Sequence, residues 1–131
     1  MMQQPGKGGR FSWRARGRSF VFAWAGILRF FRAEHNAWIH LGATVVVIVL
    51  AFALRVSRME AVALVFAIAL VWLTEMLNTA VEKIMDLLWP GIHPQVKIIK
   101  DVAAGAVLVA AVAAAITGGI IFLPKLLDAL H

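Results

Sequence analysis

The stretch that decides the fold is AVALVFAIALVWLTEMLNTAVEKIMDLLWPG, residues 61–91. It is uncharged through Thr74, becomes charged in its second half, and closes on Trp89-Pro90-Gly91. A helix needs about 20 mostly apolar residues to cross the hydrocarbon of a bilayer, and proline and glycine end helices. We therefore expect a membrane-spanning helix over 61–88 that extends out of the hydrocarbon on its charged side.

Polar side chains recur with helical spacing along the charged half of this helix. They are Glu75, Asn78, Thr79, Glu82 and Asp86. At 3.6 residues per turn, all of them lie within about 60° of the direction of Glu75. Carboxylates at membrane depth are costly and usually mark a functional site. The alternative, a solvated helix end, applies best to Asp86 and least to Glu75, which lies farthest from the loop.

Two further apolar runs and one basic, aromatic segment flank this helix. We expect membrane spans over 36–54 and 97–123. Over 11–33, arginine is interleaved with phenylalanine and tryptophan, which predicts an amphipathic helix at the membrane surface. Residues 1–10 are expected to be disordered. The sequence thus predicts an all-α membrane protein with a single domain over 11–131.

The composition excludes several classes of protein. Hydrophobic residues make up 62% of the chain and charged residues 15%, more apolar surface than a soluble chain of this length could bury. There is no cysteine, which excludes disulfides and cysteine-based zinc sites. The net charge of +6 is concentrated before the first apolar run. Because these basic residues lead into apolar sequence, they favour anionic lipid headgroups over nucleic acid as the partner.

The distribution of basic residues also predicts the orientation in the membrane. Lysine and arginine near helix ends favour the cytoplasmic side. With the N-terminus inside, that side holds the basic N-terminal segment, Lys83 and the lysines at 97 and 100, against Arg55, Arg58 and Lys125 outside. We therefore expect the N-terminus and the second loop to be cytoplasmic.

Other polar residues are expected at the same membrane level as the polar stripe. Glu34 lies at the cytoplasmic start of the first span, and Lys100-Asp101 at that of the third. Grouped carboxylates suit Mg²⁺, which prefers oxygen ligands and substrate phosphates, and carboxylates, metal and lysine together suit phosphoryl transfer. Neither a G-x-x-x-x-G-K-[ST] loop nor a protein-kinase signature occurs. From these residues, a lipid kinase and a small ion- or proton-coupled transporter fit equally well.

Three strings decide between these alternatives by resemblance. They are Glu34-His-Asn36-Ala-Trp-Ile-His40, Glu75-Met-Leu-Asn78-Thr-Ala-Val-Glu82-Lys-Ile-Met-Asp86 and Lys100-Asp101-Val-Ala-Ala-Gly-Ala-Val107. They resemble the small bacterial diacylglycerol kinase/undecaprenol kinase family, and the likeness covers about residues 19–126. It implies an integral lipid kinase of the bacterial cytoplasmic membrane that uses MgATP. It also implies a homotrimer whose active sites are shared between subunits.

The resemblance also implies a role for each site residue. Glu75 is expected to be the general base and Asn78 to orient Glu75 or the substrate. Glu34 and Glu82 are expected to hold the metal ion. The expected nucleotide contacts, with Lys100 on the phosphates, are Asp86, His93, Lys100 and Asp101.

The residue at position 40 bears on the substrate. A histidine at this position resembles the undecaprenol kinase branch of the family, whereas the diacylglycerol branch usually has a carboxylate there. Trp38 stands where family members commonly have arginine, and the N-terminal segment is more basic than usual, so contacts from that segment to ATP or lipid do not carry over from the family. We expect undecaprenol to be the substrate, with diacylglycerol as the alternative.

Overall fold

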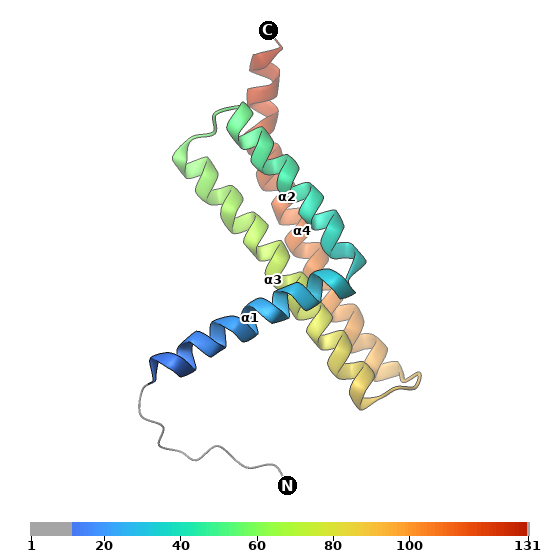
Figure 1. Ribbon diagram of the computed structural model, residues 1–131. Helices are drawn as coiled ribbons and strands as arrows, with labels where there is room; N and C mark the ends of the chain where they lie inside the picture. Colours follow the sequence, from blue (N-terminus) through green and yellow to red (C-terminus); the bar gives the residue numbers. More distant parts are fainter. Residues whose placement is uncertain (1–11, 131) are drawn as a thin grey trace. The chain divides into compact units, whose positions relative to one another are not determined.

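The computed structural model describes residues 12–130, and within them the chain forms four helices. They are α1 (Trp13–Ala33), α2 (His35–Ala53), α3 (Arg58–Leu88) and α4 (Pro94–Ala129) (Figure 1). The prediction of an all-α fold is confirmed. The disorder expected for 1–10 falls outside the described residues. Helix α1 covers the segment expected at the membrane surface, and its location there stays a prediction.

Helices α2, α3 and α4 are long and apolar enough to cross a membrane, as the sequence predicts. At 1.5 Å per residue, the 31 residues of α3 and the 36 of α4 measure about 46 and 54 Å. The hydrocarbon core of a bilayer is only about 30 Å thick. Both helices must therefore extend beyond it, whereas the 19-residue α2 is about as long as the core is thick.

Local hydrogen bonds explain the sharp turn between α2 and α3. Val56 N–H donates to Ala51 C=O and Arg55 N–H to Phe52 C=O, which satisfies carbonyls at the end of α2. Arg55 takes the left-handed conformation that this ending needs, with φ 49°. Ser57 and Glu60 then form a reciprocal capping box that begins α3 at Arg58.

Helix α4 is longer at both ends than the expected span 97–123. It begins at Pro94, whose missing N–H costs nothing in a first turn. His93 caps it, because its side chain accepts a hydrogen bond from Gln95 N–H. The helix then continues through Pro124, which neighbouring helices make tolerable in a membrane.

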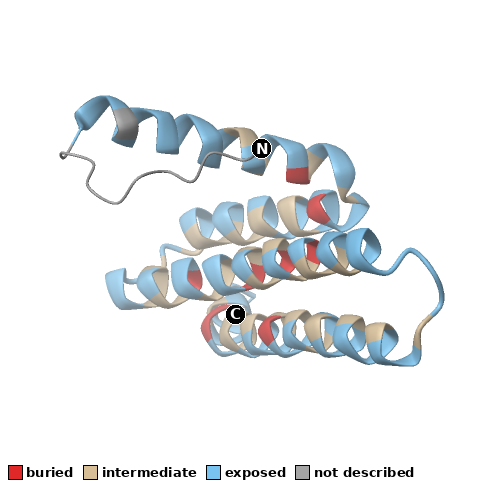
Figure 2. Cartoon of the chain, turned by 90° about the horizontal axis from the view of Figure 1, so that it is seen from below, coloured by how far each residue is buried: buried red, intermediate tan, exposed pale blue. Residues whose placement is uncertain are grey.

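The chain divides into two compact units, one ending at Ala33 and one beginning at Glu34. In the second unit, α3 packs most extensively against α4 and to a smaller extent against α2. Its small apolar core lies around Leu64, Ile121 and Phe122. Buried positions are sparse on the helices (Figure 2). Such exposure of apolar side chains fits a lipid environment, where outward faces need no protein cover.

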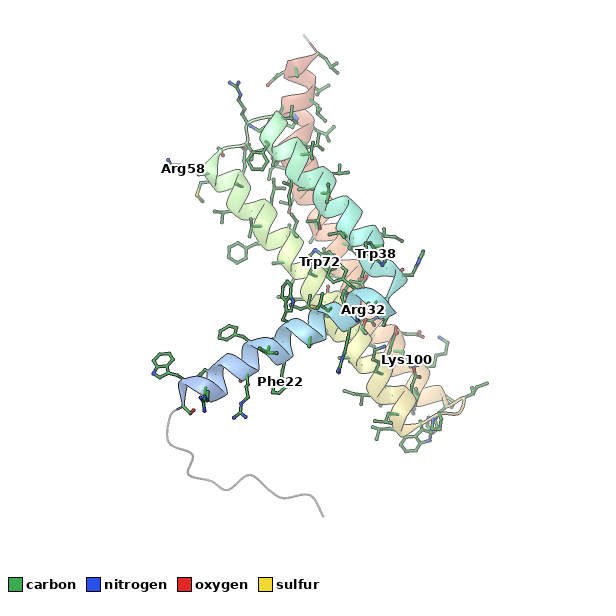
Figure 3. The ribbon with its side chains drawn as sticks, in the orientation of Figure 1. Phe22, Arg32, Trp38, Arg58, Trp72 and Lys100 are labelled. Carbon is green, nitrogen blue, oxygen red and sulfur yellow. The ribbon has the colours of Figure 1, made fainter. Side chains whose placement is uncertain are left out.

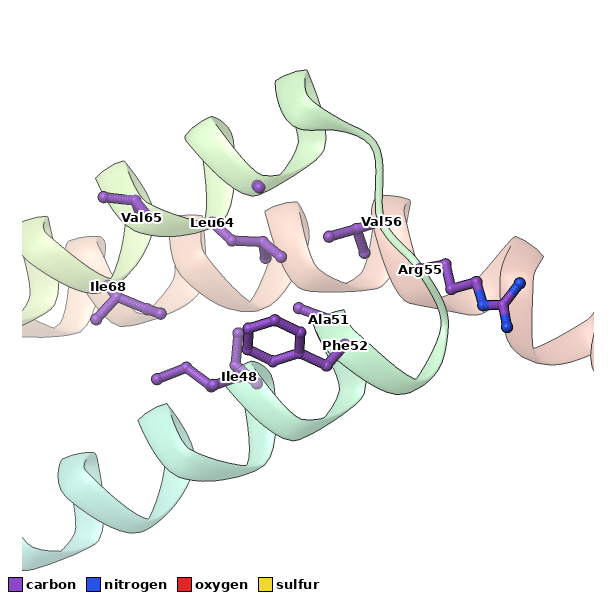
Figure 4. Close-up of a pocket in the computed structure, with 10 residues that line it drawn as sticks. Ile48, Ala51, Phe52, Arg55, Val56, Leu64, Val65 and Ile68 are labelled. Carbon is purple, nitrogen blue, oxygen red and sulfur yellow. The ribbon is translucent and has the colours of Figure 1, made fainter.

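An apolar cavity of about 450 Å³ lies between α2 and α3, next to the turn that joins them. Phe52 and Ile48 line it from α2, and Leu64 and Val65 from α3 (Figure 4). The side chain of Arg55 points away from it. The polar residues of the α3 stripe begin beyond this region, toward the other end of α3.

Candidate active site

Glu75 is the buried carboxylate of the polar stripe, with 5% of its surface exposed. On α3 it follows buried Val71 and precedes buried Thr79, so it lies on the face that helix packing covers. Its Oε1 lies 2.7 Å from Nε2 of His40 on α2. A buried carboxylate requires such a partner, because an unpaired charge in a low-dielectric environment is strongly destabilising.

A second polar contact joins α2 and α3 one turn away from the first. Trp72 Nε1–H donates to Thr44 Oγ1 over 3.1 Å, and the Thr44 hydroxyl donates to the backbone carbonyl of His40 over 2.7 Å. Trp72 lies about midway along α3 (Figure 3). The helices run in opposite directions, so position 40 faces 75 and position 44 faces 72. The two contacts therefore define one helix register.

Asn78 contacts Glu82 rather than Glu75. Its Nδ2 donates to Glu82 Oε1 over 3.0 Å, an i to i+4 contact within α3. Within the described part of the chain, its Oδ1 is buried and has no hydrogen-bond partner. A buried oxygen in that state needs a donor or a cation. The expected role of Asn78, orienting Glu75 or the substrate, stays a prediction.

Glu34 is brought to α3 by its place at the start of α2. It is the N-cap residue, yet within residues 12–130 its side chain makes no capping hydrogen bond. Instead its Oε1 lies 3.3 Å from Nζ of Lys83. Lys83 follows Glu82 directly in the chain. Glu34, at the start of α2, therefore lies beside the part of α3 that carries Glu82.

The nucleotide residues predicted on α4 lie in exposed ion pairs. Lys100 Nζ pairs with Asp86 Oδ1 across α3 and α4, and Lys97 pairs with Asp101 one turn along α4. The Asp86 side chain is 67% exposed. Exposed ion pairs contribute about 0–1 kcal/mol to stability and are screened by salt. An incoming polyphosphate can therefore displace them at little cost.

His93 has a structural role that the sequence reasoning did not identify. Its Nδ1 accepts a hydrogen bond from Gln95 N–H over 3.2 Å, and its ring centre lies 5.6 Å from that of Trp89. A cavity of about 180 Å³ lies beside this pair, between the end of α3 and the start of α4. Capping α4 and contacting a nucleotide are compatible roles, because the cap engages one ring nitrogen.

A groove of about 310 Å³ lies beside this site, between α2, α3 and α4. His40 and Thr44 line one end of it, and Phe122 lies toward the other. Between them the lining is apolar and comes from α2, α3 and α4. The small side chains of Ala111 and Ala115 leave this space open on α4.

The structure brings the predicted site residues together in pairs rather than in one cluster. Glu75 contacts His40, Asn78 contacts Glu82, and Glu34 contacts Lys83. Asp86, Lys100 and Asp101 lie in the exposed ion pairs of α3 and α4, and His93 caps α4. Among the described residues, no three His, Asp or Glu side chains converge closely enough to hold a metal ion by themselves. Mg²⁺ commonly takes one or two protein carboxylates with water and phosphates completing its shell, so this donor set of oxygens suits it.

Sequence reasoning missed two partners of the site residues. His40 entered as a marker of substrate type and as part of the segment after Glu34 that could complete the site, but not as the partner of Glu75, and Lys83 entered only as a topological charge. The available signal was that a buried Glu75 needs a hydrogen-bonding neighbour. No periodicity within α3 identifies that neighbour, because it lies on another helix.

Comparison with known proteins agrees with the motifs. Residues 21–122 match the family described as prokaryotic diacylglycerol kinase. A Synechocystis protein named diacylglycerol kinase is 43% identical over 111 residues, which cover 84% of this chain and 63% of that protein. A Bacillus subtilis protein named undecaprenol kinase is 41% identical over 109 residues, covering 83% of this chain and 89% of that protein.

The chain thus spans less than two thirds of the Synechocystis relative and most of the Bacillus one. Neither name is that of a transporter, so the transporter alternative has no support. All the predicted site residues fall inside the matched range 21–122. The resemblance seen in the motifs is confirmed: this chain belongs to the prokaryotic diacylglycerol kinase family.

Proposed function

We propose that the chain is an ATP-dependent lipid kinase, which transfers the γ-phosphate of MgATP to the hydroxyl group of a membrane lipid. The observation that carries this proposal is a buried carboxylate, Glu75, on a helix long and apolar enough to span a bilayer. A soluble substrate would not require a base at such a place. The family match and the names of both relatives support the same class of reaction.

Glu75 acts as the general base in this proposal. One carboxylate oxygen accepts the proton of the lipid hydroxyl as the lipid oxygen bonds to the γ-phosphorus. The bond from that phosphorus to the β–γ bridging oxygen breaks, and ADP leaves with the electron pair. Positioning and charge neutralisation do most of the catalysis in such transfers. A positioned base typically contributes about 10²–10⁴-fold.

Glu34 and Glu82 would hold the magnesium ion, with the unpaired Asn78 Oδ1 as a further oxygen at the same place. The donor set is all oxygen, as Mg²⁺ prefers. When bound, the ion neutralises negative charge on the phosphates. In the structure, the ammonium group of Lys83 balances the charge of the Glu34 carboxylate. Because the Lys83 side chain is 62% exposed, it can turn into water when a cation takes its place.

The nucleotide would bind on the exposed side of the same helix junction. Lys100 would exchange Asp86 for a phosphate, and Asp101 and His93 lie on the adjoining turns of α4. Asp86, once released, would contact the nucleotide or its ion. This side faces the loop between α3 and α4, which the basic residues assign to the cytoplasm, where ATP is available.

The depth of Glu75 supports a lipid hydroxyl as the acceptor. With α2 spanning the hydrocarbon, His40 lies about 8 Å inside its boundary, five residues from the start of the helix. Glu75 lies at the same depth because His40 contacts it. The groove that begins at His40 is apolar and would accommodate the adjoining hydrocarbon chain. Undecaprenol is our proposed substrate and diacylglycerol the alternative, since the relatives carry both names.

We further propose that the enzyme is a homotrimer in the bacterial cytoplasmic membrane. A single chain offers three spans, and many apolar side chains remain exposed along them. The exposed end of the polar stripe, at Asp86, would be shielded by a neighbouring subunit. The small residues of α4 provide a surface for close packing between helices.

The test is lipid-dependent ATP turnover by the purified full-length protein, reconstituted with undecaprenol or diacylglycerol side by side. We expect ADP release to require lipid and a phosphorylated lipid to form, with at least tenfold higher kcat/KM for undecaprenol. The Glu75→Gln variant serves as the control for contaminating kinases. Lipid-independent turnover, or none, would contradict the lipid kinase proposal. A preference for diacylglycerol would contradict only the choice of substrate.

A further inference from the structure

We propose that His40 is a positioning residue, which holds the Glu75 carboxylate in the orientation that receives the proton of the lipid hydroxyl. This inference rests on the proposed function and adds a residue to its machinery. The geometry gives this histidine a part in the chemistry, beyond its expected use as a marker of the substrate. The argument starts from the short contact between the two side chains.

The contact engages one oxygen of the carboxylate and leaves the other for the substrate. His40 Nε2 lies 2.7 Å from Glu75 Oε1, within the range of a strong hydrogen bond to a charged acceptor. With the Nε2–H tautomer, the ring donates and the carboxylate accepts. The hydrogen bond at Oε1 limits rotation about the last torsion of the Glu75 side chain, which is otherwise broad, so Oε2 keeps one orientation toward the substrate.

Burial makes this single hydrogen bond consequential. Glu75 is 5% exposed, and the side chain of His40 is 21% exposed. Water competes poorly there, so the partner of Glu75 must come from the protein. The imidazole lies at the mouth of the apolar groove, which His40 itself lines. The histidine therefore stands between the base and the space proposed for the hydrocarbon chain.

The histidine is itself held in place by its surroundings. Its backbone carbonyl accepts from Thr44 Oγ1, and that oxygen accepts from Trp72 Nε1–H. The indole ring of Trp72 lies edge-on to the imidazole, with 6.3 Å between ring centres. Side chains whose own partners fix them are the ones that hold a reacting group within the tolerance catalysis requires.

The contact could instead serve only to join two helices, as polar bonds between membrane helices do. The structure provides a matched control for that role. The ion pair between Lys125 of α4 and Glu60 of α3 also joins two helices, and it lies near the end of α3 that is remote from Glu75. A purely structural contact predicts similar consequences when either bond is removed. A positioning contact predicts that only loss of the His40 bond lowers the rate of the chemical step.

The experiment compares His40→Ala, His40→Gln and Lys125→Met in the reconstituted full-length enzyme. In His40→Ala we expect kcat to fall about 100-fold, the loss typical of a misplaced reacting group, with the KM values for ATP and lipid within about threefold. His40→Gln keeps an N–H donor near the position of Nε2, and it should retain kcat within about tenfold. Imidazole added to His40→Ala should restore part of the rate. Lys125→Met removes the ion pair with Glu60 and should lower thermal stability while kcat stays within about fivefold.

Two results would overturn the role of His40. One is a His40→Ala enzyme with kcat close to that of the wild type. The other is a kcat loss of equal size in Lys125→Met, or an equal loss in His40→Gln with no rescue by imidazole, since either would indicate a structural contact. A wild-type enzyme without lipid-dependent turnover is a different failure, because it removes the proposed function itself and with it the reaction that His40 would assist.

Discussion

The two ends of the polar stripe on α3 are built differently. At Glu75 the helix face is covered, and the carboxylate is held by a hydrogen bond from α2. At Asp86, three turns further, the side chain is 67% exposed and pairs with Lys100 of α4. Helix α3 thus carries one carboxylate that is buried and held in place, and a second carboxylate that is exposed to solvent.

The difference in burial separates two tasks of the proposed reaction. A base must be rigid and shielded, because electrostatic interactions are stronger and better oriented where water is excluded. A nucleotide must enter and leave, so the ion pairs that it replaces should contribute little to stability. The pair between Asp86 and Lys100 is exposed and therefore contributes little to stability. Reaction chemistry and nucleotide exchange are accordingly assigned to opposite ends of one stripe.

The sharpest test of this comparison is to neutralise one carboxylate at each end. We expect Glu75→Gln to lower kcat at least 10³-fold, near the upper range for a general base, while ATP binding and assembly persist. Asp86→Asn should lower kcat/KM for ATP by about tenfold or less. Steady-state kinetics with both substrates varied distinguishes the two. Turnover of Glu75→Gln within tenfold of the wild type would show that Glu75 is not the base.

Between these ends lies the proposed magnesium site, which should behave as a unit. Glu34→Ala and Glu82→Ala should each lower kcat/KM about 10²-fold and raise the Mg²⁺ concentration needed for half-maximal rate. The double variant should cost much less than the product of the single losses, because the second change removes a ligand from a site already broken. Magnesium titrations of the three variants measure this. Fully multiplicative losses would argue against a shared ion.

The exposed end also allows a test for sites shared between subunits. Lys100→Met should raise KM for ATP about tenfold or more, since the ammonium group no longer meets the phosphates. We expect that exchange of subunits between Lys100→Met and Glu75→Gln enzymes restores a fraction of wild-type activity. Recovery requires a site that takes these residues from different chains. No recovery, despite exchange demonstrated with labelled subunits, would place both residues in one subunit.

The smallest effect is expected at His93, where cap and nucleotide contact can be separated. His93→Asn keeps a capping side chain, whereas His93→Ala removes it at a cost of about 1 kcal/mol to helix stability. If His93 also touches the nucleotide, both variants should raise KM for ATP two- to fivefold. Thermal unfolding and ATP titrations measure the two effects independently. An unchanged KM for ATP in His93→Asn would show that His93 caps α4 and does not contact the nucleotide.

Much of the fold and part of the site could be predicted from the sequence. Apolar runs long enough to span a bilayer predicted α2, α3 and α4, because that requirement depends on length and composition alone. The spacing from Glu75 to Asp86 predicted one polar helix face. The motifs predicted the family, which the comparisons confirm. Each of these properties belongs to a segment or to a string of residues and needs no knowledge of its neighbours.

Contacts between helices depended on the tertiary structure. His40 meets Glu75 and Lys83 meets Glu34 because packing sets the rotation and axial register of α2 against α3. Helical periodicity predicts the direction in which a side chain points from the axis of its own helix. It does not predict which residue of another helix lies opposite. The sequence therefore predicted the stripe and favoured a solvated end at Asp86, whereas the partners that hold Glu75 and Asp86 were decided only by how α2 and α4 pack against α3.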